Sequence, residues 1–162
     1  MSAKPIIFQT PYVARLLQAN RFTLNRLMIR GGIETSFGSR GQGRQLIFTV
    51  EDVSKAAVAY WLFRSGLRMN AIRDALVHRN TKDLCARLTD INEIKKAASE
   101  VEFLVTWRLA KGNKAWQEIR LESDVAGLER LLEQRDQFGF VVVPIGRLLR
   151  ELADRISASS GG

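Results

Sequence analysis

Apolar residues in the first thirty positions recur at helical spacing in two short stretches. These apolar positions are Val13, Leu16 and Leu17 in the first stretch and Leu24, Leu27 and Met28 in the second. We predict that Thr10, as N-cap, and Pro11 begin the first helix, which ends near Gln18. Thr23 begins the second helix, and Gly31 follows it, because glycine accepts the conformation that ends a helix. Two short helices with so brief a connection form a helix-turn-helix.

The pattern then changes to that of strands. Residues 33–37 and 45–48 are predicted to pair as a β-hairpin, with the basic, glycine-rich loop 38–44 as its tip. Neither the P-loop signature nor the dinucleotide fingerprint is present there, so nucleotide binding is not indicated. The hairpin is interpreted as a wing that contacts a DNA backbone, and the alternative is a flexible hairpin without a ligand.

Helical spacing returns after residue 48. A capping box from Thr49 to Asp52 begins a helix that ends at Ser65, and a further helix carries Met69 to Leu76. Cap residues at 80–81 and at Asp90 predict two more helices, over 81–88 and 91–100. Their apolar positions are Leu84, Leu88, Ile91 and Ile94. This seam is interpreted as core, with a dimer contact as the alternative.

The remaining third of the chain predicts the order β-β-α-β-α. Strands are expected over 102–109 and 116–121 with a turn at 111–114, then a helix capped by Ser123 and Asp124. A short buried strand over 140–143, a last helix over 145–156 and a frayed tail over 157–162 follow. The apolar stripe of the last helix fits core better than an interface. The fold class predicted for the chain is therefore α+β.

Charge is distributed unequally along the 162 residues. The formal net charge is +8, and residues 1–80 hold twelve bases against four acids, whereas residues 81–162 hold thirteen of each. Ten of the twelve bases are arginine, whose planar fork matches phosphate and guanine edges. The excess favours nucleic acid as a partner, and a solvated basic surface is the alternative.

Other classes of function find little support. No apolar run approaches the roughly 18 residues of a membrane span and no signal peptide begins the chain, so we expect a cytoplasmic protein without a membrane partner. Cys85 and His78 are the only residues of their types, which leaves no disulfide framework, metal site, cofactor or catalytic set to expect. Cys85 is interpreted as a buried, inert thiol rather than a single-thiol sensor. His78 is interpreted as a surface or capping residue, and we expect no enzyme.

Residues 8–78 carry a recognisable order of helix, turn, helix, hairpin, helix, helix. The segments concerned are residues 12–17, Thr23-Leu24 with the closing Gly31-Gly32-Ile33, residues 48–53, and residues 62–67 with Ile72-Arg73. Read together, they resemble the winged helix-turn-helix DNA-binding domain of the MerR family of transcription regulators. Residues 25–27 depart from the family's Arg-Tyr-Tyr and Leu46 replaces its arginine before the wing aromatic, so no base preference is carried over.

The resemblance implies a sequence-specific double-stranded DNA-binding protein, a homodimeric MerR-like regulator. Three alternatives stay open: an excisionase-like or segregation-type architectural factor, an antitoxin, or an adaptor whose residues 101–156 bind a protein. The expected DNA contacts are Thr23, Asn25, Arg26 and Arg30 in the major groove, Arg40, Gln42, Arg44 and Gln45 on the wing, and Thr10 and Tyr12 on a phosphate. We expect a DNA-binding domain over 1–80, a helical linker or dimerisation segment over 81–100, and a small α+β domain over 101–162.

Overall fold

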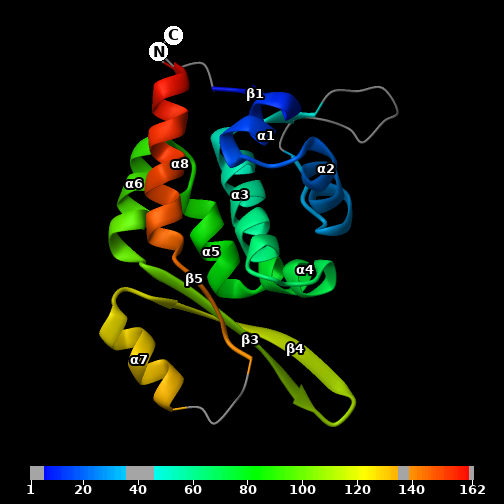
Figure 1. The fold of residues 1–162 in the computed structure, drawn as a ribbon, viewed down its shortest axis with the longest axis vertical. Coiled ribbons are helices and arrows are strands. Elements are labelled where there is room, and N and C mark those ends of the chain that lie inside the picture. Colours follow the sequence, from blue (N-terminus) through cyan, green and yellow to red (C-terminus); the bar gives the residue numbers. More distant parts are fainter. Residues whose placement is uncertain (1–5, 36–45, 135–138, 161–162) are drawn as a thin grey trace.

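The computed structural model describes residues 6–35, 46–134 and 139–160 (Figure 1). Over these residues the chain forms eight helices and two small antiparallel sheets, so the predicted α+β class is confirmed. In Figure 1 the larger sheet and the helix over residues 125–133 lie below the remaining helices. The helices are α1 (Thr10–Leu17), α2 (Arg21–Arg30), α3 (Val50–Arg64), α4 (Met69–Val77), α5 (Arg79–Arg87), α6 (Ile91–Glu100), α7 (Val125–Glu133) and α8 (Ile145–Ser160).

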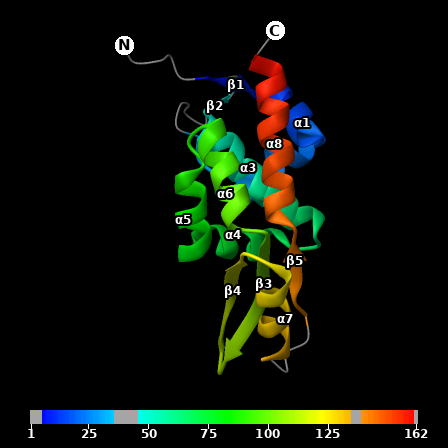
Figure 2. The same cartoon turned by 90° about the vertical axis from the view of Figure 1, so that its left-hand side faces the viewer.

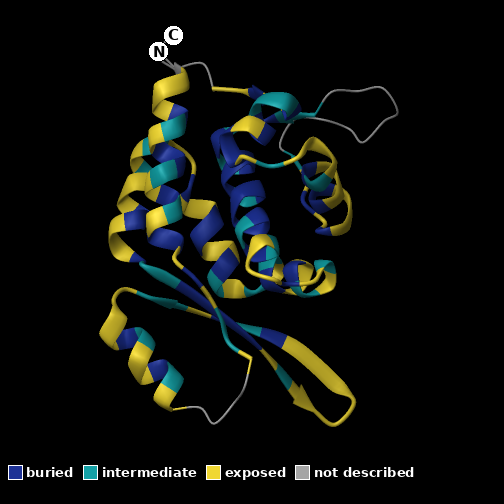
Figure 3. Cartoon of the chain, in the orientation of Figure 1, coloured by how far each residue is buried: buried dark blue, intermediate teal, exposed yellow. Residues whose placement is uncertain are grey.

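Helix α3 is the central element of the upper layer. Ten of its fifteen residues are buried, and in Figure 3 it is mostly dark blue, with teal bands of half-buried residues between. The predicted capping box begins it: the Asp52 amide donates to the Thr49 hydroxyl at 3.2 Å, and the Thr49 amide donates to Asp52 at 2.9 Å. The predicted caps of α6 by Asp90 and of α7 by Asp124 are also confirmed.

Three predicted helix starts are wrong by one to three residues. The N-cap of α1 is Gln9, and Thr10 is already helical and buried. Helix α2 starts at Arg21 because the Asn20 side chain accepts a hydrogen bond from the Phe22 amide at 2.8 Å, which places Thr23 inside the helix. Helix α5 is capped by an imidazole nitrogen of His78, which accepts from the Asn80 amide at 3.2 Å. The interpretation of His78 as a capping residue is confirmed.

The smaller sheet differs from the predicted hairpin. Its strands are β1 (Phe8–Gln9) and β2 (Ile47–Phe48), which pair antiparallel with Phe8 opposite Phe48. Both phenylalanines are buried, so this pairing fixes two aromatic rings in the core. Ile33 to Thr35, expected to be strand, carry no strand assignment, and residues 36–45 lie outside the described part of the chain.

The larger sheet has the predicted hairpin at its centre. Strands β3 (Phe103–Lys111) and β4 (Lys114–Glu122) pair antiparallel, and β5 (Val141–Val143) pairs with the other edge of β3, giving the order β4-β3-β5. One face joins the main core through Leu104 and Ile119, while α7 covers the other face. That second face holds a separate small cluster around Val105, Trp107 and Leu131.

The main hydrophobic core runs through all three predicted segments of the chain. Its buried members extend from Phe8 through Leu88 and Ile94 to Leu149, Leu152 and Ile156. Helix α8 lies beside α6 in both views and also contacts α1 (Figure 2). The interpretation of the 84–94 seam and of the last helix as core is confirmed, although Ile91 is only half-buried. The tail is shorter than predicted, because α8 continues to Ser160.

Candidate nucleic-acid interface

Helix α2 lies at the outer side of the molecule with one face buried and one face in solvent. Leu24, Leu27 and Met28 are buried against α1, α3 and α4, so the packing follows the predicted apolar spacing. Because these three positions fix the rotation of the helix, the residues opposite them face outward. The side of α2 that carries arginine is therefore the solvent side.

The predicted contacts on α2 are brought together on this outward face. Asn25, Arg26 and Arg30 are exposed, and Thr23 is half-buried at the margin. Arg21 adds a third exposed arginine, which the sequence reading left out because it placed the helix start later. Helix α2 contains no acidic residue, and none of its arginines makes an ion pair with another described residue. Their charge is consequently available to a polyanion.

Two apolar side chains share the outward face of α2. Phe22 is 69% exposed and Ile29 is 65% exposed. The Arg26 guanidinium lies 5.8 Å from the centre of the Phe22 ring, which holds the side chain along the helix surface. The sequence reading missed both residues, although each falls outside the 24, 27, 28 spacing that marks the buried side. An apolar pair between arginines suits contact with thymine methyl groups and sugars.

The first helix contributes less than expected. The Thr10 side chain is buried, so little of it is accessible to a phosphate. The Tyr12 ring stacks on Phe8 with centroids 5.4 Å apart, and the Arg15 guanidinium lies 5.6 Å from the Tyr12 centroid. The Tyr12 hydroxyl is buried and makes no hydrogen bond within the described structure. Arg15 is exposed on α1.

The predicted wing contacts lie outside the part of the chain that the structure describes. Arg40, Gln42, Arg44 and Gln45 all fall in residues 36–45, outside the described residues. Strand β2 begins two residues after Gln45, and its pairing with β1 puts the point where the chain re-enters the described structure beside α1.

The β3–β4 hairpin carries a second group of basic residues that the balanced charge of residues 81–162 concealed. Arg108, Lys111 and Lys114 are exposed at its end, and Lys111 lies directly opposite Lys114 in the register. Gly112 makes the tight turn between the two lysines, with φ +61°. Like charges in directly opposite positions repel each other, so an anion bound there is favourable. The hairpin projects on the same side of the molecule as α2 (Figure 1).

The cysteine and the candidate metal-ligating side chains of the described residues bear on catalytic or metal-binding roles. Cys85 is buried, and that burial raises the pKa of its thiol to about 12. Over residues 6–35, 46–134 and 139–160, no group of three or more His, Cys, Asp and Glu side chains is placed to hold a metal. Within the same ranges no helix has the length and apolar character needed to cross a bilayer.

Comparison with known proteins gives no match: neither a family model nor a curated protein matches this chain.

Proposed function

We propose that the chain is a sequence-specific double-stranded DNA-binding protein that acts as a dimeric, MerR-like transcription regulator. The observation that carries this proposal is the outward face of α2, where three arginines and Asn25 are exposed on a helix without an acidic residue. Base edges in the major groove are read by helices that present such groups.

The spacing of these side chains suits a helix lying in a groove. Arg26 and Arg30 are one helical turn apart, about 6 Å along the axis, which is close to the span of two base pairs. Asn25 lies beside Arg26 and is the type of residue that binds adenine through two hydrogen bonds. We assign base reading to Asn25 and Arg26. Arg30 is expected in the major groove with Thr23, and Arg21, at the start of α2, is assigned to a phosphate.

The rest of the helix-turn-helix supports α2 from behind. Helix α1 packs against α2, and α3 and α4 hold the apolar side of α2 through Leu24 and Leu27, both of which are fully buried. A recognition helix must be held rigidly by the elements packed behind it, because a misplaced arginine loses its paired hydrogen bonds to guanine. In the proposal, the predicted wing residues Arg40, Gln42, Arg44 and Gln45, which lie outside the described residues, add contacts to the DNA backbone.

Selection from a randomised pool of duplex DNA tests the proposal. The full chain is expected to enrich an inverted repeat, since a dimer presents two α2 helices to two half-sites. The logarithm of the affinity should fall steeply with the logarithm of salt concentration, with a slope of about −0.9 for each phosphate neutralised. Absence of binding at low salt would overturn the proposal.

An architectural, excisionase-like factor is the second candidate, and the basic hairpin end favours it. For such a factor, the hairpin end would contact no base. It would instead bind the phosphate backbone of bent DNA through Arg108, Lys111 and Lys114. The same selection distinguishes the two candidates. Salt-sensitive binding without an enriched motif is the outcome expected of the architectural factor, while an enriched repeat is expected of the regulator.

A further inference from the structure

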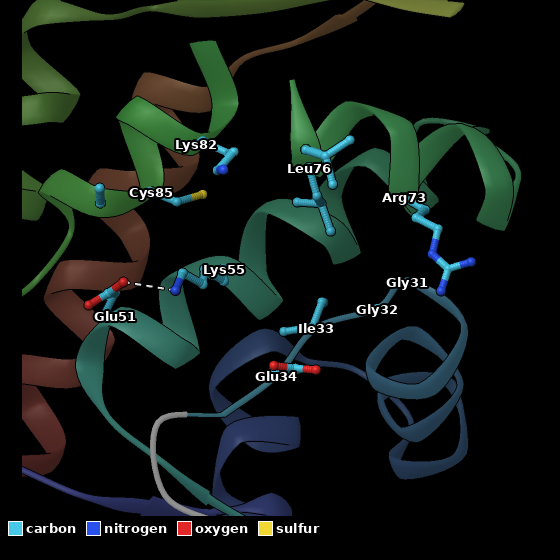
Figure 4. Close-up of a pocket in the computed structure, with 12 residues that line it drawn as sticks. Gly31, Gly32, Ile33, Glu34, Glu51, Lys55, Arg73, Leu76, Lys82 and Cys85 are labelled. Carbon is cyan, nitrogen blue, oxygen red and sulfur yellow. Dashed lines mark ion pairs between the residues drawn. The ribbon is translucent and has the colours of Figure 1, made fainter. Parts of the chain in front are cut away.

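A cavity of about 640 Å³ opens beside the C-terminal end of α2. Its walls come from four places: the segment Gly31 to Glu34 that follows α2, and helices α3, α4 and α5 (Figure 4). This volume falls in the range of cavities that hold small organic ligands. The outward face of α2 is not part of it, so the cavity is separate from the proposed DNA surface.

Three cations from three different helices surround the opening. They are Lys55 of α3, Arg73 of α4 and Lys82 of α5; in Figure 4 Lys55 and Lys82 lie on one side of Leu76, and Arg73 lies on its other side, beside Gly31 and Gly32. Lys55 already forms an ion pair, because its ammonium group lies 2.8 Å from a carboxylate oxygen of Glu51. Burial alone would lower the pKa of Lys55, but the hydrogen bond and charge of Glu51, together with the charge of Asp52, outweigh burial and raise it. Lys55 is therefore charged at any physiological pH.

Arg73 and Lys82 are the cations that remain available. Neither makes an ion pair with a described residue, and the other acid at the cavity, Glu34, is exposed at its edge. The Arg73 guanidinium lies against Gly32, where a Cβ atom would come within 3.3 Å of its Nε. Gly32 also has φ +69°, so glycine serves both the turn and the close approach.

The deeper wall of the cavity is apolar. Ile33 and Cys85 are buried there, and Leu76 is half-buried. Figure 4 shows the Cys85 sulfur and the Leu76 side chain facing the same space as the Lys82 ammonium group. A ligand that matches this lining carries negative charge, which the nearby cations Arg73 and Lys82 attract, and an apolar body for this wall.

We propose that this cavity binds a small organic anion, a carboxylate or phosphate ester with an apolar body. The segment Gly31 to Glu34 joins α2 to the cavity, so the occupant contacts the backbone on which α2 ends. The site is thus placed to link a ligand to the DNA affinity of α2. That link rests on the proposed function, whereas the binding of the anion does not.

Calorimetric titration of the full chain, without DNA, tests the site. The probes are benzoate and phenyl phosphate, with benzamide as the uncharged probe of the same shape as benzoate, and inorganic phosphate as the anion without an apolar body. Both organic anions should bind at least about 10-fold more tightly than benzamide and than inorganic phosphate. Equal affinity for benzoate and benzamide would overturn the proposal.

Three variants locate the binding. Arg73→Gln and Lys82→Gln should each weaken the better organic anion about 10-fold, whereas Lys95→Gln, an exposed lysine of α6 outside the cavity, should leave its affinity unchanged. Ala86→Trp fills the cavity from an exposed position and should abolish binding, with the circular dichroism spectrum and melting temperature of the parent retained. Unchanged binding in Arg73→Gln and Lys82→Gln would place the anion elsewhere and overturn the assignment.

The link to α2 has its own readout. A saturating organic anion should change the dissociation constant for the selected duplex at least about 5-fold in the parent chain and not in Lys82→Gln. An unchanged constant in the parent would remove the link and leave the site in place. If the chain bound no DNA at all, the proposed function would be contradicted, but the anion-binding results from the calorimetric titrations would still stand.

Discussion

Arg155, near the end of α8, donates a hydrogen bond to the backbone carbonyl of Leu16 in α1 at 2.8 Å, across 139 positions of sequence. The C-terminal helix is therefore tied to α1, the first helix of the proposed DNA-binding motif. The same helix contributes Leu149, Leu152 and Ile156 to the main core. The DNA-binding surface proposed for α2 consequently depends on residues at the far end of the chain.

Replacing Arg155 tests this tie. Arg155→Met retains much of the apolar stem and removes the donor, so it should lower the free energy of unfolding by about 1 kcal/mol. Arg147→Met is the matched control on α8, because its side chain is 73% exposed and pairs only with Glu151 among the described residues. Urea unfolding should show a change below about 0.5 kcal/mol for the control. Equal effects of the two variants would contradict a role for the Leu16 hydrogen bond.

Removing a buried side chain of α8 should also destabilise α1 and α3, because they share its core. Leu152 is fully buried, so Leu152→Ala is expected to cost about 2–5 kcal/mol. Because the core is continuous, the amide protons of α1 and α3 should lose protection in proportion. Native-state hydrogen exchange measures this directly. Undiminished protection of α1 in this variant would mean that α8 belongs to a separately folding unit.

Much of this fold follows from local patterns in the sequence. The spacing of Leu24, Leu27 and Met28 predicts the buried side of α2, and the Thr49–Asp52 box predicts where α3 begins. Both depend on residues within one or two helical turns of each other. The long-range arrangement is different: nothing near Phe8 or Phe48 indicates that they pair, and nothing near Arg155 points to Leu16.

The candidate site was predictable to a similar extent. The arginines of α2 face solvent as the periodicity predicted, since burial of the opposite face determines it. The basic hairpin end escaped prediction because residues 81–162 are neutral as a whole, and only the register places Lys111 opposite Lys114. The anion cavity escaped too, because Lys55, Arg73 and Lys82 come from three helices whose packing no local pattern encodes.

The thiol of Cys85 should be unreactive in the folded chain. Its folded pKa is raised from 9.0 to about 12, mainly by burial, so the thiolate is scarce at neutral pH and a disulfide reagent should react only on unfolding. The unfolded thiol loses its proton near pH 9, while the folded one keeps it. Its contribution to stability is therefore complete below about pH 9 and is lost as the pH rises towards 12.

A comparison with Cys85→Ala isolates this contribution. Other groups titrate in the same range in both chains, so the difference between the two unfolding free energies reports the thiol alone. As the pH is raised from about 8 to about 10, the parent chain should lose stability relative to the alanine variant. A difference that does not change with pH would contradict a raised thiol pKa.

The basic hairpin end should show two effects of opposite sign. Lys111→Ala removes one member of a repelling pair. The free energy of unfolding should therefore stay unchanged or rise by about 0.3 kcal/mol. In DNA titrations over a range of salt, the same variant should lower the salt slope by about 1, the loss of one phosphate contact. Lys95→Ala, on α6, is the charge-matched control and should keep the parent slope. A parent-like slope in Lys111→Ala would exclude the hairpin from the interface.

The most direct test of the account is the affinity of the full chain for the selected duplex and for single-base variants of it, measured for Arg26→Ala beside Arg147→Ala. Both substitutions remove one exposed arginine, but Arg26 lies on the outward face of α2, whereas Arg147 lies on α8, a helix on the other side of the molecule from α2 in Figure 1. Arg26→Ala should lose about 1–3 kcal/mol of discrimination at one base position, and Arg147→Ala should retain full discrimination. Unchanged base discrimination in Arg26→Ala would contradict the assignment of α2 as the recognition helix.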